Sequence, residues 1–189
     1  VGVRLARLRL DRLRSSDLTS IMQEVVHDRS PRVRAEAALA LRGLTSDEAT
    51  QRWVELALQH DGRDRWYLEA LGIGASAHWD ACLAAWLERV GGDWNRASGR
   101  DLIWRSRADQ TPAYLVKILS ESGQDAATLR RYVRSLDFQT GPTKDSAILQ
   151  LITDEGKIRR LPAEIFASVA IRMESFDFTV HPHLRTQWI

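Results

Sequence analysis

The stretch that decides the fold is residues 27–42, whose sequence is His-Asp-Arg-Ser-Pro-Arg-Val-Arg-Ala-Glu-Ala-Ala-Leu-Ala-Leu-Arg. An acidic turn residue, Asp28, is followed six places later by Arg34, which opens a helix rich in alanine and leucine. Between them, Ser30 and Pro31 mark the point where the chain turns and the helix begins. Apolar residues at helical spacing precede the turn, at Leu18, Ile21, Met22 and Val25. The stretch therefore predicts the second half of a helical hairpin.

Part of this stretch returns 33 residues later in the chain. The pairs that match at this offset are His27/His60, Asp28/Asp61, Arg32/Arg65, Glu36/Glu69 and Ala37/Ala70. A period of this size is typical of stacked helical hairpins. Such arrays usually act as surfaces for binding and not as pockets for chemistry. A second match, of 62–64 with 99–101, has an offset of 37, so we do not expect a strictly periodic array.

Helical periodicity continues through the rest of the chain, and no segment shows convincing strand alternation. After the two hairpins we expect helices near 77–90, 97–107, 112–121, 125–137, 143–153 and 162–173. The predicted fold class is therefore all-α, an αα-hairpin solenoid (an α–α superhelix) of about ten helices. We expect one repeat array over 1–175 and an irregular C-terminal cap or tail over 176–189.

The acidic turn and the helix that follows it resemble HEAT-like repeats, through the Asp…Arg pair around Pro31 and the Ala-Ala-x-Ala-Leu pattern. In that family the turn aspartate bonds to the backbone and to a neighbouring arginine, and equivalent pairs form a ladder along the stack. Asp28 and Arg34 match this pattern. Asp61 matches the acidic position, but Tyr67 stands where the next arginine is expected. The resemblance implies a structural ladder that begins with Asp28, Arg34 and Asp61.

A second resemblance covers about 27–140 and rests on four runs, at 60–74, 79–87, 99–105 and 129–138. The first of them reads His-Asp-Gly-Arg-Asp-Arg-Trp-Tyr-Leu-Glu-Ala-Leu-Gly-Ile-Gly. These runs are similar to the repeat region of large planctomycete-type exported bacterial proteins. Those proteins combine a sugar-dehydrogenase-like propeller, HEAT-like repeats and a C-terminal c-type cytochrome domain. The resemblance implies an arm between redox modules of an exported or periplasmic oxidoreductase, although this sequence contains no Cys-x-x-Cys-His haem motif.

Composition limits the functions that this chain can have. Its 189 residues carry a net charge of only +2, and 24 arginines and three lysines are balanced by 25 acidic residues, which argues against a nucleic-acid surface. The lone cysteine, Cys82, lies in the apolar helix expected at 81–90, and a single cysteine excludes an internal disulfide and a multi-cysteine metal site. No apolar run approaches the roughly 18–20 residues needed to cross a bilayer.

Residues 1–14 have two interpretations. Val3-Arg4 resembles Val33-Arg34, so we expect the second helix of a repeat whose first helix lies upstream. The alternative is a basic amphipathic membrane helix, because arginines alternate with leucines there. The arginines do not gather on one clean face, and no bulky aromatic residue is present to anchor such a helix in lipid. We therefore favour the truncated repeat.

The best candidate for function is the start of each second helix, because such helices commonly line the concave face of a solenoid. Arginines occur at three of these starts, and an aromatic pair, Trp66-Tyr67, follows one of them. Adjacent helical positions point about 100° apart, so Trp66 and Tyr67 cannot both face the same core. The candidate interaction surface comprises Arg32, Arg63, Arg65, Trp66, Tyr67, Arg100 and Trp104. Its structural alternative is that the arginines only bridge acidic residues and the tryptophans only pack in the core.

Catalytic, cofactor and metal sites have little support in this sequence. His27 and His60 occupy equivalent repeat positions, which favours structural roles, and His181 and His183 alone make a weak metal pair. Nucleophile triads, phosphate loops and dinucleotide fingerprints are absent as local patterns. We therefore predict a scaffold without catalytic activity or cofactor that binds a protein partner or neighbouring domains; the partner and the oligomeric state stay open.

The main alternative function is a HEAT-like nucleic-acid-binding module or DNA glycosylase-like enzyme. Such an enzyme needs aromatic residues and a carboxylate that converge in a basic groove. Trp66, Trp104, Arg100 and Asp101 are the residues that would supply them. The small net charge and the dispersal of arginine among acidic residues argue against this alternative.

Overall fold

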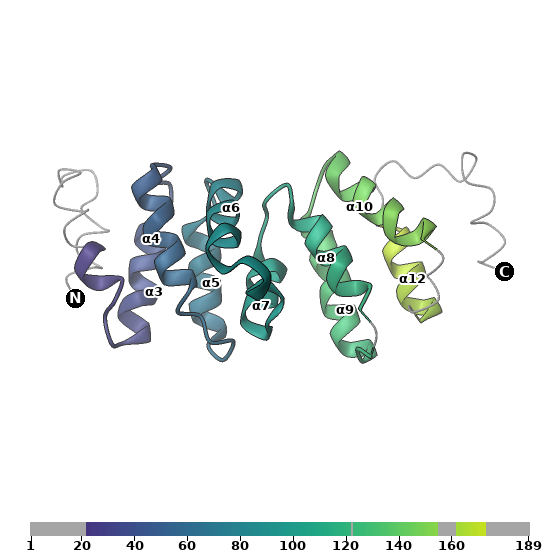
Figure 1. Ribbon diagram of the computed structural model, residues 1–189, viewed down its shortest axis with the longest axis horizontal. Helices are drawn as coiled ribbons and strands as arrows, with labels where there is room; N and C mark the ends of the chain where they lie inside the picture. The colour runs from purple at the N-terminus through teal and green to yellow at the C-terminus, as the bar shows by residue number, and fades with distance from the viewer. Residues whose placement is uncertain (1–21, 122, 155–161, 173–189) are drawn as a thin grey trace. The chain divides into compact units, whose positions relative to one another are not determined.

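The structure, a computed structural model, describes residues 22–121, 123–154 and 162–172 (Figure 1). Within these ranges every regular element is a helix and no strand occurs, so the predicted all-α fold class is confirmed. The described residues hold nine α-helices and two short 3-10 helices, in line with the about ten helices that the periodicity predicts. Contacts divide the chain into two compact units, Val1–Ala108 and Asp109–Ile189, which we call the N-terminal and the C-terminal unit.

The described helices of the N-terminal unit are α3 (Pro31–Ala40), α4 (Asp47–Ala57), α5 (Arg65–Gly74), α6 (Trp79–Val90), the 3-10 helix η1 (Gly91–Asn95) and α7 (Ala97–Arg105). Their starts follow local chemistry. Proline occupies the first position of α3, where its missing N–H costs nothing. The Ser46 hydroxyl accepts from the Ala49 N–H at 3.2 Å and caps α4, and the Asp64 carboxylate caps α5.

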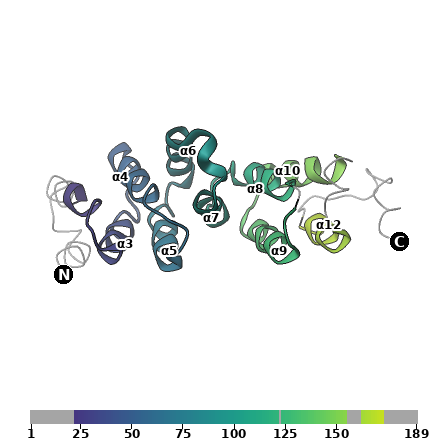
Figure 2. The same ribbon diagram turned by 60° about the horizontal axis from the view of Figure 1, so that its bottom comes forward.

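Helices that are two apart in the sequence pack side by side in this unit. α3 contacts α5, α5 contacts α7 and α4 contacts α6, so that α3, α5 and α7 form one layer and α4 and α6 the other (Figure 2). α3 and α5 approach closely because Gly74 lacks a side chain: a Cβ there would overlap the carbonyl oxygen of Ala38. Between the layers Trp53 is fully buried, donates its indole N–H to the Leu71 carbonyl at 2.8 Å, and packs edge-on against Trp79.

The described helices of the C-terminal unit are α8 (Thr111–Leu119), α9 (Ala126–Ser135), the 3-10 helix η2 (Leu136–Phe138), α10 (Pro142–Thr153) and α12 (Ala163–Ala170). Here too the packing joins helices two apart, α8 with α10 and α9 with α12, and also the successive pair α8 and α9. Asp125 caps α9 by accepting from the Thr128 N–H at 2.9 Å. The buried core of the unit includes Leu115, Ile118, Leu136 and Ile148.

The helix boundaries differ from the predicted ones mainly where the chain tightens. The glycine pair expected only to separate two helices begins η1, and the helix expected over 97–107 ends at Arg105. The helix expected over 125–137 ends at Ser135, and η2 follows. The predictions for 1–14, for the tail over 176–189 and for the histidines at 181 and 183 lie outside the described residues. The single array over 1–175 stays a prediction, because both of its ends lie outside the described residues.

Candidate interaction surface

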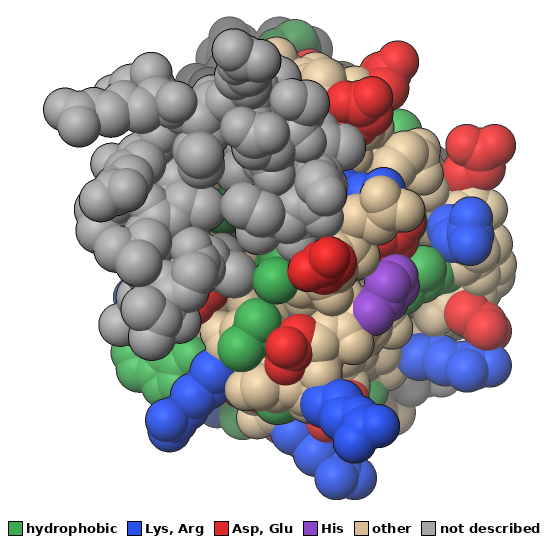
Figure 3. Space-filling model, turned by 90° about the vertical axis from the view of Figure 1, so that its left-hand side faces the viewer, with side chains coloured by type: hydrophobic (Ala, Val, Ile, Leu, Met, Phe, Trp, Pro, Cys, Tyr) green, Lys and Arg blue, Asp and Glu red, His purple; other side chains and the backbone are tan. Residues whose placement is uncertain are grey.

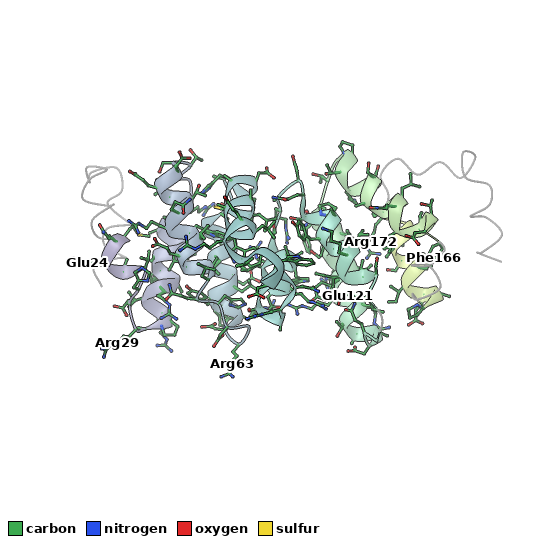
Figure 4. The ribbon with its side chains drawn as sticks, in the orientation of Figure 1. Glu24, Arg29, Arg63, Glu121, Phe166 and Arg172 are labelled. Carbon is green, nitrogen blue, oxygen red and sulfur yellow. The ribbon has the colours of Figure 1, made fainter. Side chains whose placement is uncertain are left out.

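Four of the seven residues predicted for the interaction surface are exposed together where α3 and α5 begin. They are Arg32, Arg63, Arg65 and Trp66, and Arg29 of the turn before α3 joins them. Trp66 is 80% exposed, the highest value of any large apolar side chain among the described residues. Arg29 and Arg63 project from the same edge of the unit in Figure 4, and Lys and Arg side chains gather along the lower edge of Figure 3. We call these five residues the turn-end surface.

The two turns beneath this surface are built in the same way. The Asp28 carboxylate accepts from the Ser30 N–H at 2.7 Å, and the Asp61 carboxylate accepts from the Arg63 N–H at 2.9 Å. Both bonds span two residues, the pattern of an Asx turn. The hydrogen bond from the Arg63 N–H is the main reason that the pKa of Asp61 lies below its usual value. These carboxylates therefore serve the backbone, and the 33-residue repeat of the sequence is a repeat of turn geometry.

Tyr67 does not belong to the interaction surface, which corrects the prediction that included it. The side chain is buried at 3% exposure, and its hydroxyl donates to the Leu56 carbonyl of α4 at 2.8 Å. Burial raises the pKa of this hydroxyl, so it remains a donor at neutral pH. Because adjacent helical positions diverge by about 100°, burial of Tyr67 turns Trp66 outward. The alternative that Trp66 packs in the core is wrong, whereas Trp53 and Trp86 are buried.

Arg34 binds the turn through the backbone and not through the Asp28 carboxylate, which corrects the form of the predicted ladder. Its guanidinium donates to the main-chain oxygens of Asp28 at 2.7 Å and Arg29 at 3.3 Å. The same guanidinium lies over the Tyr67 ring, 5.6 Å from its centroid. Tyr67 is thus the position that receives Arg34 from the preceding hairpin, and its ring in turn stacks on His60 at 6.3 Å.

Arg100 makes the next equivalent contact, which the sequence analysis missed. Its Nε donates to the main-chain oxygen of Asn95 at 3.0 Å and to the Asn95 side-chain oxygen at 2.9 Å. Arg34, Tyr67 and Arg100 lie at a constant spacing of 33 residues, and this spacing was the signal that could have found the contact. Alignment of the glycines at 62 and 99 obscured it. Arg100 is therefore half-buried and held by the turn.

Trp104 also lies apart from the exposed group. It is half-buried in α7, one turn beyond Arg100. The residue that follows it, Arg105, donates to the Glu69 carboxylate of α5 at 2.9 Å, and its guanidinium crosses Gly72, where a Cβ would overlap it. This pair fits the structural alternative for arginine, a bridge between neighbouring helices. Arginines of α7 are thus structural, whereas those at the starts of α3 and α5 are exposed.

A buried pair of titratable groups connects the end of α4 with α7. His60 Nε2 lies 3.3 Å from a carboxylate oxygen of Asp101, and the histidine side chain is only 1% exposed. Asp101 also borders the turn at Gly62, 3.7 Å from the place of a Cβ on that glycine. The equivalent His27 is largely exposed and lies 3.7 Å from Glu55. Asp101, which a glycosylase-like site would need free in a groove, is therefore engaged by His60.

The described residues contain no cluster of three or more His, Cys, Asp or Glu side chains able to hold a metal ion. Cys82 is fully buried, and burial raises the pKa of its thiol to about 12, so it is not an activated nucleophile. In the part of the chain that the structure describes, no helix combines the length and apolar character needed to cross a membrane.

Comparison with known proteins adds no relative: no protein-family model, curated protein or solved structure matches the chain.

Proposed function

We propose that the chain is a HEAT-like helical-repeat scaffold, without catalytic activity of its own, that binds a protein partner or a neighbouring domain through the turn-end surface. The observation that carries this proposal is the exposure of Trp66 among four exposed arginines. Tryptophan and arginine are the residues most enriched at binding hot spots, and they act by packing into a pocket or pairing with a carboxylate of the partner.

The energetics of Trp66 support a binding role. Full burial of a large apolar side chain stabilises a protein by about 1.5–3 kcal/mol. With 80% of its surface exposed, Trp66 contributes little of this to the fold. The α5 helix starts at Asp64 and packs through Tyr67, Leu68 and Leu71, so its stability does not need an aromatic residue at 66. A partner that covers Trp66 would recover the burial energy on binding.

The repeat character of the proposal rests on packing and on turn chemistry. Helices two apart pack together in each unit, which is how successive hairpins of a solenoid stack. The Arg34 and Arg100 guanidiniums bind turn carbonyls at positions 66 residues apart, twice the sequence period. Both features support a HEAT-like array in which the turns form a continuous edge and the partner approaches that edge.

The larger setting of the scaffold follows from the resemblance to exported bacterial dehydrogenase and c-type cytochrome proteins. We propose that the chain is a segment of such an oxidoreductase and holds its redox modules. The full-length gene tests this setting directly. A Cys-x-x-Cys-His motif downstream and a signal peptide upstream would support it, and a gene with neither would exclude it.

Site-specific photo-crosslinking tests the binding role. A benzophenone amino acid is placed at position 66, or at the control position 84, where α6 exposes an alanine. The full-length protein is irradiated in its own cells. We expect a discrete protein adduct, or a crosslink to another segment of the same chain, from position 66 and not from position 84. Equal yields from both positions contradict the proposal, as would a crosslink to nucleic acid or excision of an alkylated base by the purified chain.

A further inference from the structure

We infer that the turn-end surface binds an acidic segment of protein, one that presents at least two carboxylates about 10 Å apart and an apolar side chain beside them. The inference rests on the proposed function and specifies the chemistry of the partner. It depends on the pairing of the arginines, on the spacing of the two turns and on the position of Trp66.

The arginines of the turn-end surface differ from the other arginines of the unit in their pairing. Arg52, Arg96 and Arg105 form ion pairs with Glu55, Asp93 and Glu69 at 2.9–3.0 Å. Within the described residues, none of the four guanidiniums of the turn-end surface forms an ion pair. Guanidinium groups match carboxylates in a two-pronged geometry. These four therefore offer donors that the fold itself does not use.

The carboxylates closest in sequence to these arginines are engaged by the backbone. Asp28, Asp61 and Asp64 accept from the N–H groups of Ser30, Arg63 and Tyr67 at 2.7–3.0 Å. In addition, the first turns of α3 and α5 contain no acidic residue, so the positive ends of both helix dipoles lie beneath the arginines. Positive charge at these ends is unfavourable within the isolated chain. An acidic partner would remove that penalty.

The spacing of the two turns defines how such a partner would fit. α3 and α5 pack against each other, and packed helices have axes about 8–10 Å apart. An extended chain advances about 3.3 Å per residue, so carboxylates three residues apart reach the two turns together. Trp66, in the first turn of α5, then faces the residues between or beside those carboxylates. An apolar side chain there would cover the exposed indole.

A protein fits this surface better than a nucleic acid does. A phosphate backbone presents a negative charge at every nucleotide and would pass close to the carboxylates of Asp28, Asp61 and Asp64. The whole chain carries a net charge of only +2, so it offers little long-range attraction for a polyanion. Trp66 is the only large aromatic side chain of the described N-terminal unit that is classed as exposed, which is too few for a stacking platform. A peptide places its charges selectively and avoids the aspartates.

Binding of fluorescein-labelled probes to the full chain tests the inference. The probes are a 12-residue peptide with glutamate at every third position and one leucine, the same peptide with glutamine in place of glutamate, and a single-stranded oligonucleotide of equal charge. The variants are Arg63→Ala/Arg65→Ala and the matched pair Arg42→Ala/Arg89→Ala, which removes two exposed arginines elsewhere in the unit. Anisotropy at about 0.15 M salt limits attraction to groups within about 8 Å of the probe.

We expect the glutamate peptide to bind at least about tenfold more tightly than the glutamine peptide. The Arg63/Arg65 pair should weaken it about five- to tenfold and the Arg42/Arg89 pair less than about twofold, with circular dichroism unchanged in both. Equal binding of the two peptides, equal effects of the two variant pairs, or tighter binding of the oligonucleotide would overturn the inference. If a protein still crosslinks to position 66, only the acidic chemistry fails; if none does, the proposed function fails as well.

Discussion

Replacement of Gly74 by alanine tests the stacking of α3 on α5, which brings the two turns of the interaction surface together. Gly74 is the last residue of α5 and is buried. A Cβ at this position would overlap the Ala38 carbonyl oxygen and lie 3.2 Å from the Ala38 carbonyl carbon. Real Cβ atoms essentially never approach another heavy atom more closely than 3.0 Å. The obstructing atoms belong to a helix backbone, so they cannot rotate away as a side chain can.

The expected cost follows from two opposing terms. Extra volume in a tightly packed interface costs about 1–3 kcal/mol. Alanine gains up to about 1 kcal/mol over glycine inside a helix, but little at the last residue. The Gly74→Ala variant should therefore lose about 1–2 kcal/mol of unfolding free energy. Gly72→Ala should be close to neutral, because its Cβ meets only the movable Arg105 guanidinium and the helix propensity gain offsets the loss of the pair with Glu69.

Urea unfolding followed by tryptophan fluorescence measures these changes in the correct unit, because six of the seven tryptophans lie in the N-terminal unit. The matched control is Gly92→Ala in η1, whose Cβ would meet nothing within 4 Å. It should change the free energy of unfolding by less than about 0.5 kcal/mol. If Gly74→Ala were as stable as this control, α3 and α5 would not pack as described, and the reasoning about the paired turns would fail.

Three further predictions concern single groups. Asp28→Ala should cost about 1–2 kcal/mol in urea melts because a turn hydrogen bond is lost, and Asp47→Ala should cost less; equal, negligible losses would contradict the turn geometry. The Cys82 thiol, whose burial raises its pKa to about 12, should react with Ellman's reagent at pH 8 only after unfolding, and rapid labelling of the native chain would show that it is accessible. The hydrogen bond from the Thr128 N–H lowers the pKa of Asp125 below 3.8, so the stability gained from its charge is complete above about pH 4 and is lost as the pH falls through the folded pKa; Asp125→Asn should flatten the acid limb of thermal melts followed by circular dichroism, and an unchanged limb would refute this.

Local patterns predicted the helices well because the signals that start them are local. Proline at 31, serine at 46 and the Asp64 carboxylate begin α3, α4 and α5, as their side-chain chemistry requires. The repeated Asp-x-x-x-x-x motif correctly indicated equivalent turns at 28 and 61. The tight turn at η1 was not predicted, because a pair of glycines is compatible with several turn geometries.

The composition of the surface was only partly predictable, because it depends on contacts between distant residues. Helical geometry requires Trp66 and Tyr67 to diverge, but which of them is buried follows from the Leu56 carbonyl that accepts the tyrosine hydroxyl. Nothing in the neighbourhood of His60 indicates that Asp101, 41 residues away, lies beside it. The engagement of Arg100 by Asn95 was readable only from the constant 33-residue spacing of positions 34, 67 and 100.

The central claim is that the turn-end surface serves binding and not stability. The most direct test measures both properties in one variant, Trp66→Ala, using the partner captured at position 66. Because Trp66 is 80% exposed, the free energy of unfolding should change by less than about 0.5 kcal/mol. The dissociation constant for the partner should rise at least about tenfold, as expected for a tryptophan at a hot spot. An unchanged dissociation constant, or weaker binding that appears only with a matching loss of stability, would contradict the claim.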